Sequence, residues 1–363
     1  MNPVRQLLTF GQSPWLDYIQ RALFTSGDFQ RLIDEDGIRG VTSNPAILAK
    51  AVRHPEYREA IARLRPDAAD TTALYEALIR EEIQLACDAL RPVWEENEGV
   101  EGLVSLEVAP DLAWETEATI REALRLAALI DRPNLMIKVP ATRPGLEAIR
   151  RLTAQGINVN ATLIFSPGRY LEVARAWQAG MEERLRQGQP MHKPVSVASF
   201  FVSRIETLAD DLLEAASEHQ PESRDLIGRI ALAAARRAYS HYLALRHSDA
   251  WVRLLDAGAH PQRLLWASTS TKNPAYSDVK YVDGLVGPET IDTLPPATLD
   301  AYRDHGHPAP RLEPPYLEEA AAVLEAFAAL GFDIEIMAER LELEGVEKFQ
   351  LAWEKLMNAL EAA

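Results

Sequence analysis

The amino-acid sequence predicts an α/β protein, a (β/α)8 or TIM barrel with additional helices at the C-terminal end of the chain. Short apolar, β-branched runs alternate with longer segments of helical periodicity, which is typical of a parallel sheet covered by helices. Seven or eight such units span roughly 290 residues, which fits a closed barrel better than an open doubly wound sheet. No G-x-G-x-x-G motif follows any run, so a dinucleotide-binding domain is disfavoured.

The strand candidates follow one another along the chain at the spacing of β/α units. Seven are clear, and an eighth, Ser13–Asp17, is short and weak on its own. The clear candidates are Ile38–Thr42, Leu103–Val108, Leu135–Val139, Ile157–Ile164, Val195–Val202, Leu264–Ala267 and Val279–Leu285. The amphipathic segments between them are Thr71–Trp94, Thr116–Ile130, Arg169–Arg186, Arg204–Ser217 and Asp225–Ala257.

The last fifty or so residues contain no strand candidate but show helical periodicity. The predicted helices are Leu317–Leu330, Ile334–Glu342 and Val346–Leu360, and the prolines that precede them are Pro308, Pro310, Pro314 and Pro315. We therefore expect a barrel of residues 1–310 and a helical extension of residues 311–363 packed on it. The extension could seal the barrel, form a dimer contact or cover the active site; an apolar face of Leu351, Leu356 and Leu360 favours packing within the chain.

Composition excludes several classes of function. Lysine and arginine number 38 against 54 acidic residues, and the resulting net charge of −16 disfavours binding to nucleic acid or to an anionic membrane. A local cationic pocket would still allow a small phosphorylated substrate. The single cysteine, Cys87, and the eight scattered histidines match no disulfide or metal-site spacing, so we expect no metal. No leader segment or membrane-length apolar run is visible, which predicts a cytoplasmic protein.

Polar side chains stand near the carboxyl ends of most of the predicted strands. Active sites of such barrels lie at that end, and residues two apart in a strand share a face. The pattern directs one coherent polar set into the barrel: Thr42, Asn44, Glu107, Lys138, Asn160, Thr162 and Ser199, with Phe201 on the same face as Ser199. An alternative for each Asn or Ser is a turn or capping role.

Lys138 is the residue in this set that is hardest to explain structurally. It lies within Leu-Met-Ile-Lys-Val-Pro, and lysine is rarely buried without a partner or a function. The chain has only seven lysines, and the others lie outside strongly apolar strand interiors. Burial favours the free amine, which adds to a ketone or aldehyde to form a Schiff base. A carboxylate such as Glu107 and nearby polar groups would then move protons and hold a water.

Six segments of the chain form a recognisable set: Gly40–Pro45, Asn134–Thr142, Gly156–Ser166, Val197–Arg204, Leu264–Pro274 and Tyr281–Gly287. Together these segments resemble the transaldolases. They occur in order, at barrel spacing and over nearly the whole chain, and together they are highly specific. The last two look like the longer bacterial form, which has extra C-terminal helices.

The resemblance implies a class I aldolase-type enzyme of the pentose phosphate pathway that needs no cofactor. Such an enzyme moves a dihydroxyacetone unit from sedoheptulose 7-phosphate to glyceraldehyde 3-phosphate, which gives erythrose 4-phosphate and fructose 6-phosphate. By resemblance, Lys138 forms the Schiff base, Asp17 exchanges the proton of the C4 hydroxyl, and Glu107 activates a water that Thr162 helps to hold. The expected substrate-binding residues are Thr42, Asn44, Asn160, Ser199, Phe201, Arg204, Ser268 and Lys272.

The phosphate end of the site departs from the pattern of the shorter transaldolases. Their second phosphate-binding arginine is missing, and Ser270 occupies roughly its place, two residues before Lys272. Arg204 is the expected phosphate ligand, with Lys272 as a second cation or, alternatively, a solvated loop residue. Ser43 also replaces a threonine in the Thr-Ser-Asn-Pro segment, which keeps the hydroxyl.

Two other functions stay open at this point. One is a fructose-6-phosphate aldolase-like enzyme, although those resemble a shorter barrel with a tyrosine near the water, whereas this chain has Phe201. The other is a non-catalytic barrel that binds sugar phosphates, which would not require a buried amine. The sequence does not decide between a monomer and a homodimer.

Overall fold

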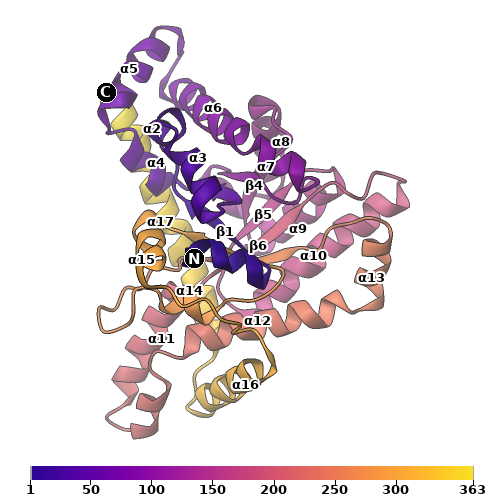
Figure 1. The fold of residues 1–363 in the computed structure, drawn as a ribbon, viewed down its shortest axis with the longest axis vertical. Coiled ribbons are helices and arrows are strands. Elements are labelled where there is room, and N and C mark those ends of the chain that lie inside the picture. Colours follow the sequence, from indigo (N-terminus) through magenta and orange to yellow (C-terminus); the bar gives the residue numbers. More distant parts are fainter. Residues whose placement is uncertain (1, 363) are drawn as a thin grey trace.

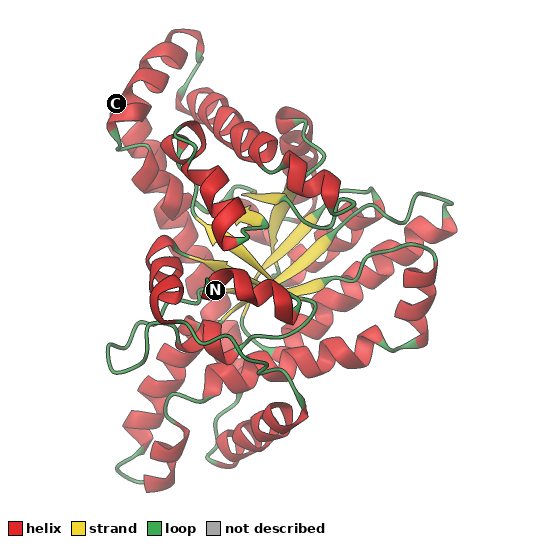
Figure 2. Ribbon diagram, in the orientation of Figure 1, coloured by secondary structure: helices red, strands yellow, loops and turns green. Residues whose placement is uncertain are grey.

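The computed structural model describes residues 2–362, which form a closed barrel of eight parallel strands in the order β1 to β8. Figure 2 shows the strands at the centre and the helices around them. The strands are β1 (Gln12–Asp17), β2 (Gly40–Thr42), β3 (Leu103–Glu107), β4 (Leu135–Pro140), β5 (Val159–Ile164), β6 (Ser196–Phe201), β7 (Arg263–Ala267) and β8 (Thr290–Leu294). The predicted (β/α)8 barrel is therefore confirmed.

Helices follow the strands and form the outer layer (Figure 1). They are α1 (Pro3–Gln6), α2 (Arg21–Thr25), α3 (Asp28–Arg31), α4 (Pro45–Ala51), α5 (Pro55–Leu64), α6 (Thr71–Ala89), α7 (Arg91–Glu96), α8 (Thr116–Ile130), α9 (Arg143–Ala154), α10 (Pro167–Arg186), α11 (Ser203–Ala216), α12 (Ile230–Arg246), α13 (Asp249–Asp256), α14 (Lys280–Gly284), α15 (Pro296–His305), α16 (Pro314–Ala329) and α17 (Ile334–Ala362).

The turns from strand to helix at the carboxyl end are set by local sequence. Asn44, Thr142 and Ser166 each precede a helix, and each side-chain oxygen accepts a hydrogen bond from a backbone N–H of the first turn. A proline stands in the first turn of all three helices, where its missing N–H costs nothing. These caps fix where the chain leaves the barrel mouth and so position the loops around it.

The eighth strand does not lie where the sequence predicts it. Val279–Leu285 was expected to be a strand, but its centre forms the short helix α14, and β8 is formed by Thr290–Leu294. The apolar run reflects the buried side chains Tyr281 and Val282, which belong to this short helix and not to a strand. The true strand is the polar sequence Thr-Ile-Asp-Thr-Leu, which pairs with both β1 and β7 and closes the barrel. The weak candidate Ser13–Asp17 is confirmed as part of β1.

The C-terminal extension differs from its prediction in one respect. The two expected helices Ile334–Glu342 and Val346–Leu360 form a single helix, α17, which continues through the residues between them. In Figure 1, α17 (yellow) runs to the C-terminal end beside α5, where Arg65 Nη2 donates a hydrogen bond to the carbonyl of Leu360 over 2.6 Å. Of its predicted apolar face, Leu356 and Leu360 are buried, but Leu351 is 47% exposed.

Two further expectations concern the chain as a whole. The predicted segment Asp225–Ala257 is divided between α12 and α13, with a break at 247–248. No helix in residues 2–362 combines the length and apolar character needed to cross a membrane. The division into a barrel of residues 1–310 and an extension of residues 311–363 stays a prediction.

Candidate active site

A cavity of about 360 Å³ opens at the carboxyl end of the strands. Of the predicted site residues, those that line it are Asp17, Thr42, Asn44, Lys138, Thr162, Ser199, Phe201, Arg204, Ser268 and Lys272. Glu107 and Asn160 do not line it, but they are buried on strands adjacent to Lys138. Residues from seven different strands or the loops that follow them therefore meet in one place, as the barrel geometry requires.

Lys138, which lines the cavity, forms a buried pair with Glu107. They stand opposite each other on β4 and β3, and Lys138 Nζ lies 3.8 Å from Glu107 Oε2. Both side chains are almost fully buried, with exposed fractions of 6% and 4%. Lys138 Nζ also donates a hydrogen bond to the carbonyl of Ser43 over 3.0 Å. The amine is thus held on the cavity side of β4, opposite to the apolar side chains of that strand.

Glu107 is poised to exchange a proton near neutral pH. Burial raises the pKa of its carboxyl to about 7, although the positive charge of Lys138 opposes the shift. Neither carboxylate oxygen accepts a hydrogen bond, and the buried hydroxyl of Thr162 also lacks a partner. Thr162 lies within an irregularity of β5, between Ala161 and Ile164, where Leu163 adopts a positive φ of 61°. Unpaired acceptors and a hydroxyl near one amine are a suitable environment for a bound water.

Asp17 lies at the end of β1 within a chain of hydroxyl groups. Thr42 Oγ1 donates to Asp17 Oδ1 over 2.6 Å, and it lies 2.7 Å from Thr293 Oγ1 on β8. Burial raises the pKa of Asp17, and the Thr42 hydrogen bond and the charge of Lys138 oppose that effect. Thr42, held in turn by Thr293, therefore fixes the orientation of one carboxylate oxygen of Asp17, a residue that lines the cavity.

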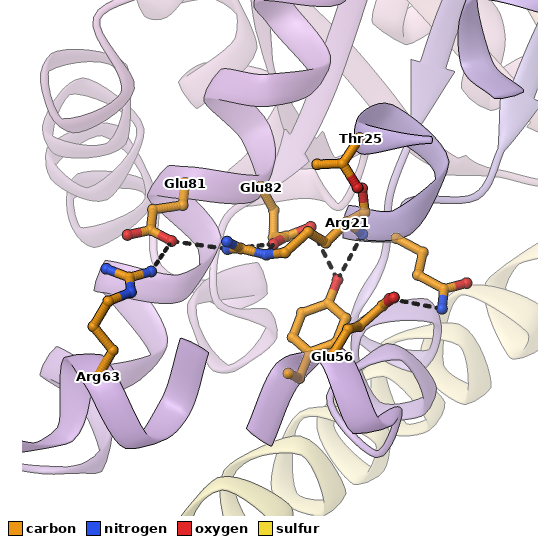
Figure 3. A network of polar contacts seen from close by, with 8 residues as sticks. Arg21, Thr25, Glu56, Arg63, Glu81 and Glu82 are labelled. Atoms are coloured by element: carbon orange, nitrogen blue, oxygen red, sulfur yellow. Dashed lines mark hydrogen bonds and ion pairs between the residues drawn. The ribbon is translucent and has the colours of Figure 1, made fainter. Parts of the chain in front are cut away.

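The segment after Asp17 is tied to the outer helices by a polar network (Figure 3). Arg21, at the start of α2, donates to Glu82 over 2.7 Å and to Glu81 over 2.8 Å, both on α6. Tyr57 of α5 donates to the other oxygen of Glu82 over 2.9 Å. Because Arg21 follows Asp17 by four residues, this network restrains the backbone that carries the aspartate.

Asn160 is joined by a hydrogen bond to Ser199, which lines the cavity. Ser199 Oγ donates to Asn160 Oδ1 over 2.6 Å, and Asn160 Nδ2 donates to Ser105 Oγ over 3.0 Å. Asn44 has a capping role as well, because its Oδ1 accepts from the N–H of Ile47 over 3.0 Å. Its amide NH₂ remains the group that can face a ligand. For Asn44, which lines the cavity, the structural and the ligand-binding interpretations are thus compatible.

Arg204 provides a cation at the outer part of the cavity. Its guanidinium carbon lies 5.5 Å from the centre of the Phe201 ring and 6.0 Å from that of Phe349. Nη1 is buried without a hydrogen-bond partner, and burial lowers the pKa of the group. A buried guanidinium with an unused N–H is suited to an anionic oxygen.

Lys272 and Ser268 lie on the loop after β7, close to Arg204. Lys272 Nζ donates to Ser270 Oγ over 2.7 Å, and partial burial together with the charges of Arg204 and Lys50 lowers its pKa. Ser268 Oγ lies 2.8 Å from Ser203 Oγ. The positive charges of Arg204 and Lys272 repel each other at the cavity rim, and a bound dianion would relieve this repulsion.

The sequence analysis did not name Thr293, Lys348 or Phe349, which also line the cavity. Thr293 was missed because β8 was placed too early in the chain. Lys348 and Phe349 belong to α17, and no local pattern indicates that this helix passes over the barrel mouth.

A second cavity, of about 420 Å³, lies between α10 and α17. Its charged residues neutralise one another: Arg169 contacts Glu342 over 3.3 Å and Glu172 over 3.2 Å, and Glu335 accepts a hydrogen bond from the N–H of Gly168 at the start of α10. Ser166 Oγ donates a hydrogen bond to Glu335 in this cavity, and Ser166 also caps α10. Within residues 2–362 no three His, Cys, Asp or Glu side chains cluster in a way that could hold a metal ion.

Comparison with known proteins gives consistent matches over the whole chain. The family model described as "Transaldolase/Fructose-6-phosphate aldolase" matches residues 14–360. A protein named transaldolase from Thiobacillus denitrificans is 45% identical over 358 residues, which cover 98% of this chain and 99% of that protein. Proteins of the same name from Trichodesmium erythraeum and Mycobacterium tuberculosis are 42% and 44% identical, and each match covers 99% of this chain and 97% of the relative.

Proposed function

Since the chain belongs to the transaldolase/fructose-6-phosphate aldolase family, we propose that it is a transaldolase that works through an imine on Lys138. It takes a dihydroxyacetone unit from a ketose phosphate such as sedoheptulose 7-phosphate and transfers it to glyceraldehyde 3-phosphate. The observation that carries the proposal is the buried pair of Lys138 and Glu107, 3.8 Å apart, beside a hydroxyl and carboxylate oxygens that have no hydrogen-bond partner.

The first half of the reaction joins the substrate to the enzyme. The amine of Lys138 attacks the C2 carbonyl of the donor, and Glu107 moves the protons that allow the carbinolamine to lose water. A carboxyl with a pKa of about 7 can both give and accept a proton at neutral pH. The hydroxyl of Thr162, which has no hydrogen-bond partner, binds the water that is released when the imine forms and the water that later hydrolyses it.

The second half breaks and remakes a carbon–carbon bond. Asp17 takes the proton of the C4 hydroxyl, the C3–C4 bonding electrons move into the protonated imine, and an aldehyde leaves an enamine on Lys138. When the acceptor aldehyde enters, the enamine attacks its carbonyl carbon and Asp17 returns the proton to the new hydroxyl. Glu107 then helps water to hydrolyse the imine, which frees the product and the lysine.

Substrate binding divides between the two depths of the cavity. Asn44, Asn160 and Ser199 lie near Lys138 and orient the hydroxyls of the dihydroxyacetone unit. Arg204 and Lys272, with Ser268, bind the phosphate at the rim and overcome the repulsion from a chain of net charge −16. A cytoplasmic location, and a monomer or a homodimer, stay predictions.

A fructose-6-phosphate aldolase-like reaction is the second candidate, because the family includes both activities. Phe201 favours the transfer reaction over the aldolase reaction. Its ring lines the cavity and, unlike a tyrosine, has no hydroxyl that could bind a second water molecule next to the enamine. An enamine kept from water waits for an aldehyde acceptor instead of being protonated and released as free dihydroxyacetone.

Borohydride trapping with fructose 6-phosphate tests the proposal. We expect one covalent adduct on the peptide that contains Lys138, seen by mass spectrometry, and none in the Lys138→Met variant. A coupled assay with and without erythrose 4-phosphate then separates the two activities: product that appears only with the acceptor indicates a transaldolase. An adduct elsewhere, or no adduct, would contradict the proposed mechanism.

A further inference from the structure

The last helix of the chain forms one wall of the active-site cavity. Lys348 and Phe349 of α17 line the cavity together with Lys138 and Arg204 (α17 is yellow in Figure 1). Phe349 is itself buried, with an exposed fraction of 6%. The C-terminal extension therefore does more than cover the outside of the barrel: it contributes side chains to the site.

A glycine one turn before Phe349 allows this close approach. A Cβ at Gly345 would lie 3.1 Å from Leu163 Cδ2 and 3.5 Å from Arg204 Nη1. The first distance is already tighter than ordinary van der Waals contact. The backbone of α17 thus lies directly on the guanidinium, and residue 349, four positions further on, shares that helix face.

Arg204 is held by aromatic rings and not by a carboxylate. Phe201 and Phe349 both lie within the range of a cation–π contact, at 5.5 and 6.0 Å. The acidic residues that act on its charge, Glu344 and Glu107, do so through space. Glu344 itself is engaged by Arg340 over 2.9 Å and by Lys348 over 3.3 Å.

This arrangement has a chemical advantage for an anion site. A carboxylate at position 349 would fix the guanidinium but would occupy its N–H groups and cancel its charge. A phenyl ring fixes the guanidinium by its face and leaves the N–H groups free, and Nη1 is indeed without a partner. Because the side chain is immobilised before the ligand arrives, less conformational entropy is lost on binding.

We propose that Phe349 is a positioning residue that holds Arg204 ready for the substrate phosphate and so makes the enzyme selective for phosphorylated donors. The inference rests on the proposed function, because it concerns the same site. It assigns to α17 a role in substrate selection beside that of Phe201 on β6. It also predicts an effect on binding of the phosphate that is separable from the chemistry at Lys138.

The test compares non-aromatic and aromatic substitutions at one position. Phe349→Leu and Phe349→Met keep most of the apolar volume but remove the ring face, whereas Phe349→Tyr keeps it. We expect the first two to raise KM for fructose 6-phosphate by about three- to tenfold, in line with typical cation–π energies. We expect kcat with this donor, and kcat/KM for unphosphorylated fructose, to change by less than about twofold. Phe349→Tyr should behave as the wild type.

Two further measurements make the result decisive. Leu343→Ala, on the same helix but 60% exposed, is the matched control and should leave both donors unaffected. In an Arg204→Ala background, Phe349→Leu should add nothing to KM, because a positioning residue acts only through the group that it holds. Melting temperatures of all variants separate a folding defect from a change in binding.

Three outcomes would overturn the inference. The first is Phe349→Leu and Phe349→Met with wild-type KM. The second is an equal loss for fructose and fructose 6-phosphate, which would mean that Phe349 shapes the whole cavity. The third is an additive effect with Arg204→Ala. The proposed function fails in a different way, since it would be contradicted by wild-type protein that shows no borohydride adduct on Lys138.

Discussion

Charged side chains lie at both ends of the barrel, but the two ends differ in how these side chains are paired and hydrogen-bonded. At the amino end, Arg263 donates to Glu101 over 2.6 Å, to Ser13 over 3.2 Å and to the carbonyl of Val100 over 2.9 Å. At the carboxyl end, Lys138 and Glu107 are 3.8 Å apart, and both oxygens of Glu107 lack a hydrogen-bond partner. Arg204 Nη1 also has no hydrogen-bond partner.

The difference separates a structural charge from a functional one. At the amino end Glu101 Oε1 accepts hydrogen bonds from Arg263 and Ser13, although Oε2 has no partner. Where opposite charges meet at hydrogen-bonding distance in this way, each charge is compensated within the protein, and removal of either mainly affects stability. Where opposite charges are buried but lie beyond hydrogen-bonding distance, their donor and acceptor atoms stay without partners in the folded state. A ligand or a reaction intermediate can then bind to these atoms. We therefore expect substitutions at the carboxyl end to alter activity more than stability. Substitutions at the amino end should alter stability more than activity.

The largest expected effect is at Lys138, the proposed nucleophile. Lys138→Met should abolish turnover and borohydride trapping, because it removes the amine but keeps a side chain of similar volume in the same apolar strand. Circular dichroism and the melting temperature should remain close to those of the wild type. EDTA should not reduce wild-type activity. Activity that survives the substitution would show that another group forms the covalent intermediate.

The two carboxyl groups should affect different steps, each by about 10²- to 10⁴-fold. Asp17→Ala should still form an imine, which accumulates because cleavage of the carbon–carbon bond is blocked. Glu107→Ala should slow formation of the imine itself. Rapid-quench borohydride trapping with fructose 6-phosphate measures both. Equal trapping rates in the two variants and the wild type would contradict this division.

Glu107 also provides a pH signature. Its pKa in the folded state is about 7, above the value of 4.5 for an exposed glutamate, so the folded state holds this proton more tightly than the unfolded chain does. The stability from this group is therefore present below about pH 4.5 and is lost as pH rises through about 7. Glu107→Gln should flatten the dependence of Tm on pH in that window. An unchanged curve would show that Glu107 does not hold its proton in this way.

A smaller effect is expected at the cavity rim. Arg204→Ala should raise KM for phosphorylated donors by about tenfold or more, since a hydrogen bond to a charged group contributes roughly 1.5–3 kcal/mol. Lys272→Ala should raise it more modestly, because Lys272 is more exposed. Neither should greatly change the weak turnover of unphosphorylated fructose. If Lys272→Ala has no effect, Lys272 is a solvated lysine and Arg204 acts with Ser268, Ser270 or backbone N–H groups.

Much of the fold could be predicted because the strands follow simple rules. Apolar runs with one polar residue near the carboxyl end located seven strands, including the weak Ser13–Asp17 run. The prediction of the eighth strand was wrong because two segments break the rule. Val279–Leu285 is apolar but contains a helix, whereas Thr290–Leu294 is polar but forms the strand that closes the barrel. The position of a closing strand is determined by its two neighbours, β7 and β1, and not by its own composition.

The same contrast applies to the candidate site. Residues on strands could be placed because the two-residue period assigns each to a face, and Lys138 was evident from its apolar surroundings. Lys348 and Phe349 could not be placed, because their position depends on the path of α17 over the barrel. Gly345, which allows that path, looks in the sequence like an interruption between two helices.

The smallest expected effect on activity, and the sharpest test of the comparison, is at the amino end. Arg263→Met leaves the nearly buried carboxylate of Glu101 without its cation, which typically costs about 3 kcal/mol or more. Tm should therefore fall by several degrees, while kcat and KM stay within about twofold of the wild type. Replacing both residues, Arg263→Met with Glu101→Leu, should recover much of the loss, because no uncompensated charge is left inside. A change in KM for fructose 6-phosphate as large as that of Arg204→Ala would show that the two ends are coupled, and the separation between structural and functional charges would then not hold for this barrel.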